Sequence, residues 1–334
     1  EEWTAHGFRY RPGDDLEQTT PIIRPTQLDK QPWLKAVLQK NPDILNDFFW
    51  PDGHIRVTGR EYNGLLESAC YQRGKMSCTS CHSMHNSDPD DQLARGMRGN
   101  RACLQCHDEM VGNITQHTHH AADSVGSNCT NCHMPHTSYG LLKAIRGHTI
   151  ETPDVATTLE TGRPNACNLC HLDKTLDWTA KQLAKRSGQA KPTVPEEHRT
   201  TAASVLWLLK GDAGQRALAA WHMGWQPAQG VSGSPWMVPF LGELLGDQYD
   251  AVRFLAAQSL RSVPGFEEFD YDFVGPVDDR IDAAVGAIQK WSTSSFPDRY
   301  RLPRLLFNTN GALDITAMRD LFDERDTTAL FLRE

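Results

Sequence analysis

Apolar and small residues recur at helical spacing in the C-terminal part of the chain. The first predicted pair of helices carries them at Val205, Leu206, Leu208, Leu209, Ala219 and Ala220. The arrangement returns 37 residues later, so that Leu208 corresponds to Leu245, Arg216 to Arg253 and Ala219 to Ala256. Two amphipathic helices per repeat of this length predict a HEAT-like α-helical repeat domain over residues 199–334. The alternative is an ordinary helical domain with coincidental spacing.

Other segments carry weaker helical patterns. We expect further helices at Asp278–Trp291 and Asp314–Asp323 in the C-terminal part. Residues 187–198 are rich in Gly, Pro and charge and predict a linker, while residues 1–57 are punctuated by prolines and predict an arm. Within this arm, short helices are expected at Trp33–Gln39 and Asp43–Phe49. Thr58 and Glu61 have the spacing of a capping box, which predicts the start of a helix that runs toward Cys70.

The segment between the arm and the linker is poor in apolar side chains. From Gln72 to Ser138, its Val, Ile, Leu, Phe and Trp residues are limited to Leu93, Leu104, Val111, Ile114 and Val125. Such a segment cannot bury enough side-chain surface to offset the entropy of ordering its backbone. We therefore expect residues 58–186 to fold around a large apolar cofactor, with little regular secondary structure.

The same segment contains the string Cys-x-x-Cys-His four times. The copies are Cys78, Cys81 and His82; Cys103, Cys106 and His107; Cys129, Cys132 and His133; and Cys167, Cys170 and His171. Each string can hold one covalently attached haem c, with thioether bonds from both cysteines and a proximal bond to iron from the histidine. The spacing predicts one short helical turn for each of four haems. The near-even separation of the first three strings, 25 and 26 residues, predicts a stacked row.

Zinc sites, redox dithiols and disulfide frameworks also use paired cysteines. Zinc does not require a histidine directly after every pair, and a thioredoxin-like dithiol would occur once beside a βαβ pattern. Eight of the nine cysteines belong to the four strings. The pattern therefore favours four haems, with a zinc protein as the alternative.

Candidate distal ligands of the irons come from the surplus of histidines. We expect them among His54, His85, His119, His120, His136 and His148. The group His117, His119 and His120 is expected to supply one or two. His85 and His136 lie three residues after a proximal histidine, so each can reach a neighbouring haem but not the opposite face of its own. Axial methionine is the alternative, and it would raise the potential.

Several residues keep more than one interpretation. Arg95, Arg98 and Arg101 can clamp haem propionates or form a solvated basic face. Cys70, the ninth cysteine, is interpreted as buried and inert, with a redox thiol or an intermolecular link as alternatives. His198 and His222 are expected to be ordinary residues. His6 lies on the arm. It either has no role or contacts a haem of another subunit.

Charge and hydropathy narrow the class of protein. The formal net charge is −8 and no basic block occurs, which excludes nucleic acid as a favoured partner. No apolar run approaches the length of a transmembrane segment. Haem c is attached outside the cytoplasm, and the sequence begins at Glu1. We therefore expect an exported periplasmic or extracellular protein whose signal peptide has been removed.

The motifs together resemble multihaem c-type cytochromes of bacteria. The resemblance is to the branch in which a domain related to the tetrahaem cytochromes of ammonia oxidisers is joined to TPR-like or HEAT-like repeats. The residues that carry it are Ser68–Cys70, Gly74–His85, His117–His120, Cys129–His136, Arg146–His148 and Arg163–His171. The resemblance implies a mainly α protein in which closely packed, mostly bis-His haems pass electrons to redox protein partners, with the repeats as scaffold or docking surface.

Three functions remain open at this point. An electron-transfer protein needs no acid–base residue and only the haems. A subunit of an extracellular conducting filament would pass electrons between identical subunits, through a head-to-tail contact that does not close. An oxidoreductase acting on a small nitrogen or sulfur compound would need one iron with an open position.

Overall fold

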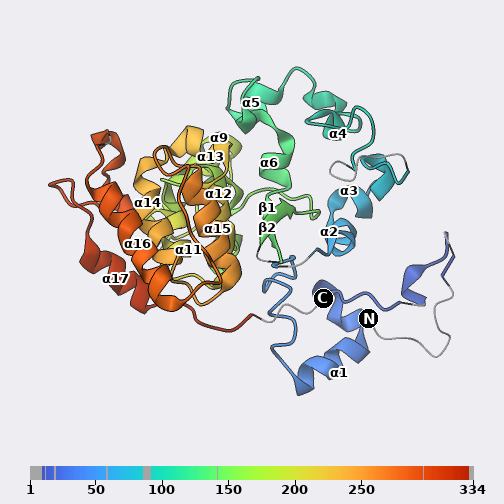
Figure 1. Ribbon diagram of the computed structural model, residues 1–334. Helices are drawn as coiled ribbons and strands as arrows, with labels where there is room; N and C mark the ends of the chain where they lie inside the picture. Colours follow the sequence, from blue (N-terminus) through green and yellow to red (C-terminus); the bar gives the residue numbers. More distant parts are fainter. Residues whose placement is uncertain are drawn as a thin grey trace.

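The computed structural model describes residues 10–11, 13–18, 20–57, 59–85, 92–140, 142–295 and 297–330, and it is mainly helical, as the sequence predicts. Figure 1 shows the C-terminal helices gathered in one body, with α2 to α6 following an arc beside it. The α-helices are α1 (Pro32–Lys40), α2 (Glu61–Glu67), α3 (Ala69–Gln72), α4 (Arg101–Leu104), α5 (Ile114–Thr118), α6 (Cys129–His133), α7 (Val155–Thr161), α8 (Ala166–Cys170), α9 (Leu176–Ser187), α10 (Glu196–Thr200), α11 (Ala203–Leu209), α12 (Ala213–Met223), α13 (Gln226–Ser232), α14 (Val238–Leu244), α15 (Asp250–Arg261), α16 (Val277–Ser292) and α17 (Ile315–Asp323).

Short elements connect these helices. The 3-10 helices are η1 (Leu16–Gln18), η2 (Pro25–Lys30), η3 (Cys78–Ser80), η4 (Asp108–Met110), η5 (Val125–Ser127), η6 (Pro235–Met237), η7 (Asp298–Tyr300) and η8 (Pro303–Leu305). Strands β1 (His136–Tyr139) and β2 (Lys143–Arg146) form an antiparallel hairpin in which His136 pairs with Arg146. In Figure 1 this hairpin lies between the helical body and α2.

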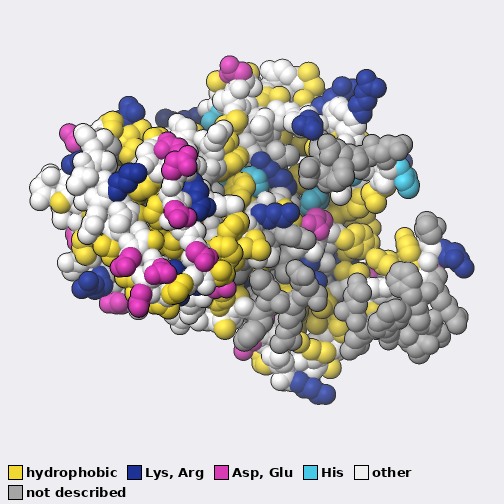
Figure 2. Space-filling view, viewed as in Figure 1, with side chains coloured by type: hydrophobic (Ala, Val, Ile, Leu, Met, Phe, Trp, Pro, Cys, Tyr) yellow, Lys and Arg dark blue, Asp and Glu magenta, His cyan; other side chains and the backbone are white. Residues whose placement is uncertain are grey.

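The main hydrophobic core lies in the C-terminal body. Helices α11, α12, α14 and α15 pack against one another, and α14 also packs against α16. The two positions of each pair spaced by 37 residues are buried together: Leu208 and Leu245, Arg216 and Arg253, Ala219 and Ala256. The helix predicted at Asp278–Trp291 is present as α16, and the one predicted at Asp314–Asp323 as α17. Acidic side chains are spread over the face of this body shown in Figure 2.

The arm contacts both of the parts that follow it. Phe48, Phe49 and Ile55 form a small core of their own, while Val57 is buried in the main core. Arg24 pairs with Glu67 of α2 at 3.0 Å. The arm is therefore packed on the helical body and on residues 58–186, which are called the haem segment after the cofactor that the sequence predicts for them.

Two local predictions in this part differ from the structure. The helix predicted at Trp33–Gln39 is present as α1, but Asp43–Phe49 forms a series of turns that ends in a bridge between Phe49 and Ile55. The bridge requires an extended backbone at Phe49, which a helix cannot provide. Thr58 lies outside the described residues. The helix after it, α2, ends at Glu67, and Ser68 caps the separate helix α3 by accepting a hydrogen bond from the Tyr71 amide.

The fourth motif is built onto the helical body. Leu169, within the motif, and Leu172, directly after it, belong to the main hydrophobic core. The Asn165 side chain accepts a hydrogen bond from the Cys167 amide at 3.0 Å and so caps α8. The backbone that carries Cys167, Cys170 and His171 is therefore anchored by ordinary apolar packing, unlike the three motifs before it.

Candidate functional site

All four Cys-x-x-Cys-His strings lie on short helical turns, as their spacing predicts. They occupy η3, α4, α6 and α8. In three of them the histidine amide donates to the carbonyl of the first cysteine, from His82 to Cys78 at 2.9 Å, from His107 to Cys103 at 3.0 Å and from His171 to Cys167 at 2.8 Å. None of the eight cysteines of the strings, nor Cys70, forms a disulfide. Each turn therefore presents two thiols and an imidazole from one local unit.

Consecutive motifs lie beside one another. The Gln105 side chain of the second motif donates to the Ser80 carbonyl of the first at 3.0 Å. The backbone amide of Cys129, the first residue of the third motif, donates to Oδ1 of Asn100, three residues before the second motif, at 2.8 Å. Helices α6 and α8 pack together and join the third motif to the fourth. The four motifs therefore follow one another in space in the order of the sequence.

Three of the four proximal histidines face a second imidazole. The ring centroids of His82 and His148 are 6.1 Å apart with 29° between the ring planes. His133 faces His117 at 6.0 Å and 16°. His171 faces His120 at 6.1 Å and 28°. Two imidazoles on opposite sides of one metal ion, each with a metal–nitrogen bond of about 2 Å, have centroids roughly 6 Å apart.

Backbone carbonyls fix the orientation of these rings. Because a carbonyl only accepts, the ring nitrogen that faces it carries the proton and leaves the other nitrogen with a lone pair. The four Nδ1-to-carbonyl distances are 3.3 Å from His82 to Gln92, 2.7 Å from His120 to Thr118, 2.6 Å from His133 to Glu151 and 3.0 Å from His148 to Arg146. In each of these histidines Nε2 is therefore the nitrogen available to a metal.

Burial keeps several of the rings neutral. It lowers the pKa of His171 to about 4, with a further contribution from the neighbouring His120. Burial also lowers the pKa of His148, and that of His117, where His133 adds to the effect. A neutral imidazole is the form that binds iron or another metal. The electrostatics of the site therefore favour the ligand form near neutral pH.

The second motif differs from the other three. His107 is exposed, and its Nδ1 lies 3.3 Å from the Glu109 carboxylate. Among the described residues no second imidazole is stacked against it. His6, which the sequence leaves as a contact between subunits, lies outside the described residues.

The remaining predicted ligands lie elsewhere. His85 is exposed and its carbonyl accepts from the Ser83 hydroxyl. His119 has a left-handed backbone with φ of 57°, and its Nε2 lies 3.4 Å from the Arg186 carbonyl. Thus His117 and His120 face proximal rings, whereas His119, between Thr118 and His120, points away toward α9. The sequence offers all three as a group but contains no signal that selects among them.

His136, which the sequence predicts as a ligand of a neighbouring haem, packs against the helical body. Its Nδ1 lies 3.2 Å from Nε2 of His222, whose own Nδ1 donates to the Leu218 carbonyl at 2.8 Å. Trp221 and Trp225 lie against His136 with centroids at 4.7 and 5.2 Å. His222 is buried, which lowers its pKa to about 3. This contact of His222 carries no signal in the sequence, because its partner is 86 residues away in the chain.

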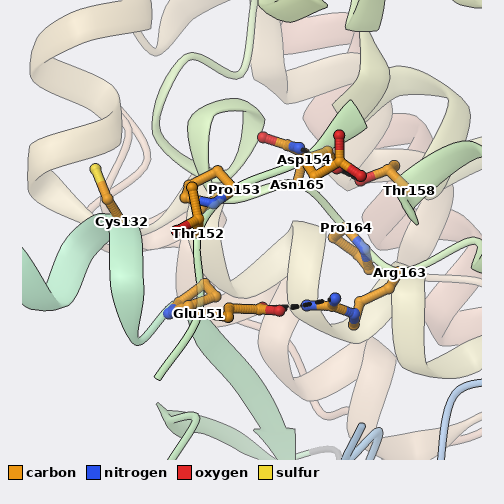
Figure 3. A pocket seen from close by; sticks show the side chains of 11 residues that line it. Cys132, Glu151, Thr152, Pro153, Asp154, Thr158, Arg163, Pro164 and Asn165 are labelled. Atoms are coloured by element: carbon orange, nitrogen blue, oxygen red, sulfur yellow. Dashed lines mark hydrogen bonds and ion pairs between the residues drawn. The ribbon is translucent and has the colours of Figure 1, made fainter. Parts of the chain in front are cut away.

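His54 belongs to an ion-pair network between the arm and the haem segment. Its ring nitrogens lie 3.2 Å from Asp52 and 3.2 Å from Glu151. Arg163 pairs with the same two carboxylates. Figure 3 shows the Glu151–Arg163 pair at the wall of a pocket that also reaches Cys132. Because the Glu151 carbonyl accepts from His133, this network supports the ring of the third proximal histidine.

The stability of the protein is expected to depend on His54 above neutral pH. Burial alone would lower the pKa of His54, but its hydrogen bonds to Asp52 and Glu151 raise it from 6.5 to about 9, while Arg163 opposes them. The charged form is thus favoured in the folded state, and its contribution is complete below pH 6.5 and lost as the pH rises through 9. The free energy of unfolding should fall by about 3 kcal/mol over this window.

Urea denaturation at a series of pH values measures this effect. The His54→Gln variant should lack the slope, whereas His85→Gln, a change at an exposed histidine, should keep it. An equal slope in wild type and His54→Gln would assign the pH dependence to other groups.

The described part of the haem segment between residues 67 and 154 has no hydrophobic core of its own. Among the described residues between 67 and 154, no hydrophobic side chain is buried, and the buried residues there are Ser68, Ser127 and Ser138. Neither thiols nor neutral imidazoles supply a core, yet all of them are held in defined positions. The donor set of two thiols per turn and paired imidazoles fits haem c.

Comparison with known proteins agrees with this geometry. The family described as doubled CXXCH motif matches residues 71–112, which hold the first two motifs. This match supports a multihaem c-type cytochrome. No curated protein and no solved structure matches the chain. The CXXCH motifs indicate covalent haem c binding and a role in electron transfer. No helix in the described part of this chain has the length and apolar character needed to cross a membrane.

Proposed function

We propose that the chain is a tetrahaem electron-transfer cytochrome that passes single electrons along its four motifs. The observation that carries this proposal is the set of three histidine pairs with centroids 6.0 to 6.1 Å apart. Each pair combines a proximal histidine with one from a distant turn, so three independent pairings reach the same spacing.

The pairs support a set of ligands for the irons. His82 and His148 would hold the first haem, His133 and His117 the third, and His171 and His120 the fourth, while His107 would supply the proximal ligand of the second. Haem c, when bound, supplies an iron that exchanges one electron at a potential set by its ligands and surroundings. The two cysteines of each motif would anchor the group covalently. The carbonyls that accept from Nδ1 of His82, His120, His133 and His148 leave Nε2 of these rings available to bind its iron.

The proposed path follows the order of the motifs. A hydrogen bond links the first motif to the second, another links Asn100, just before the second motif, to the third, and helix packing links the third to the fourth. The exposed turn around His107 and Cys106 provides a surface where a redox protein partner can exchange electrons. No acid–base residue is needed for this activity.

We place the protein in the periplasm or at the cell exterior, since haem c is attached after export. The two helix pairs α11–α12 and α14–α15 are proposed to be HEAT-like repeats, because the residues spaced by 37 are buried at corresponding positions. They serve as the scaffold that carries the fourth motif and can also supply a contact between identical subunits in a filament.

The number of haems is the direct test of the proposed function. Mass spectrometry of the intact, purified protein should find four covalently added haems, and a variant with Cys167→Ala and Cys170→Ala should carry three. Cys70→Ala is the matched control, since Cys70 belongs to no motif, and it should retain four. A mass equal to that of the bare polypeptide would overturn the proposal.

A second candidate function rests on the environment of His107. Because no described imidazole faces it, the second motif can hold an iron with an open position, as an oxidoreductase acting on a small nitrogen or sulfur compound requires. Electron paramagnetic resonance of the ferric protein separates the two functions. Wholly low-spin iron supports the electron carrier, and a high-spin component that binds such a compound supports the enzyme.

A further inference from the structure

Arg146, the last residue of β2, bonds to two of the proposed haem sites at once. We propose that Arg146 is a positioning residue that couples the first and third haem sites and raises their reduction potentials through its charge. This inference rests on the proposed function, because it concerns residues that would surround bound haem.

The guanidinium group of Arg146 holds the turn that carries the third motif. Nη1 donates to the Thr130 carbonyl at 3.1 Å and to the Met134 carbonyl at 3.3 Å. Nη2 donates to Oδ1 of Asn131 at 2.5 Å. Thr130 and Asn131 are the two residues between Cys129 and Cys132. The guanidinium group therefore forms hydrogen bonds with the turn that carries both cysteines. A planar fork with several fixed donors is suited to this arrangement, whereas a lysine ammonium is not.

The backbone of Arg146 contacts His148, the proposed second ligand of the first site. The Arg146 carbonyl accepts from Nδ1 of His148 at 3.0 Å, which leaves Nε2 of His148 with the lone pair available to a metal, and the ring centroid of His148 lies 6.1 Å from that of His82. The β-hairpin fixes this carbonyl, because Arg146 pairs with His136 in the ladder. A displacement of the Arg146 side chain therefore moves the third motif and the ligand of the first haem relative to each other.

No carboxylate among the described residues forms an ion pair with Arg146. The side chain is partly buried, and among the described residues its partners are two carbonyls, an amide oxygen and the ring of Trp225, whose centroid is 5.9 Å from Cζ. Other arginines near this segment have acidic partners, such as Arg163 with Asp52 and Glu151. Reduction of a haem removes one positive charge from its iron. A fixed positive charge nearby therefore favours the reduced form and raises the potential.

Two substitutions test the charge by different means. Arg146→Met removes it, and Asn131→Asp compensates it by placing a carboxylate against Nη2 while the arginine stays. In a spectroelectrochemical titration, each should shift two of the four reduction potentials to more negative values and leave the other two unchanged. Arg146→Lys keeps the charge and loses the fork, so its potentials should stay near those of the wild type while the low-spin resonances of the first and third sites change.

Lys143→Met is the matched control, since it removes the same charge from the exposed start of the same strand. It should leave all four potentials in place. Haem content, measured by mass spectrometry on every variant, separates the two proposals: absence of haem contradicts the proposed function. Four haems with unchanged potentials in Asn131→Asp contradict the role of Arg146 alone. Asn131→Asp keeps this test decisive if Arg146→Met does not fold.

Discussion

Replacement of His120 by alanine is expected to convert one haem site from low-spin to high-spin iron. The ring of His120 stands 6.1 Å from that of His171, and its Nδ1 is held by the Thr118 carbonyl. Without this ring, no other described imidazole faces His171, so the sixth position of the iron in the fourth site becomes open to water. The ferric protein should gain the high-spin resonance of one site, with the matching change in its absorption spectrum.

His119→Ala is the control for this experiment. It removes an imidazole directly beside His120, but the His119 ring lies toward the Arg186 carbonyl. We expect it to leave the low-spin spectrum unchanged. A high-spin signal in His119→Ala, together with none in His120→Ala, would reverse the assignment of the two residues.

Replacement of Asp247 by alanine should have the largest effect on stability. Its carboxylate accepts from Arg216 at 2.7 and 3.1 Å and from Arg325 at 3.2 Å. The side chains of Asp247 and Arg216 are fully buried, each with 0 % exposure. Removal of the carboxylate leaves a guanidinium charge without compensation in the core, which costs about 3–5 kcal/mol.

Chemical denaturation, followed by the circular dichroism of the helical body, measures this loss. Asp298→Ala is the matched control, because its carboxylate is 96 % exposed and lies 3.7 Å from Arg301. Its effect should stay within about 0.5 kcal/mol. A similar small effect of Asp247→Ala would mean that the Arg216 charge finds another partner.

The local structure of the motifs could be predicted from sequence because it depends on neighbouring residues. The spacing of two cysteines and a histidine requires one helical turn, and the four turns are present. The small number of apolar residues between Gln72 and Ser138 likewise predicts that this segment has no hydrophobic core of its own. Helices α16 and α17 follow from an apolar periodicity that the main core uses.

The pairing of histidines could not be predicted from sequence, because it is decided by how distant turns pack. His148 faces His82 across 66 residues of chain, and His117 lies near the third motif in sequence without any pattern that distinguishes it from His119. His54 resembles a ligand in composition alone. Its environment of two carboxylates and Arg163 comes from segments about 100 residues apart.

The anchoring of Leu169 and Leu172 in the main core has a consequence for biogenesis. If haem is attached after export of the chain, the first three motifs emerge before the C-terminal helices. The fourth motif is packed against α11, α12 and α13 once these helices fold. Haem attachment at the fourth motif therefore competes with folding of the C-terminal helices. Slower folding of these helices should increase the fraction of protein that carries haem at all four motifs.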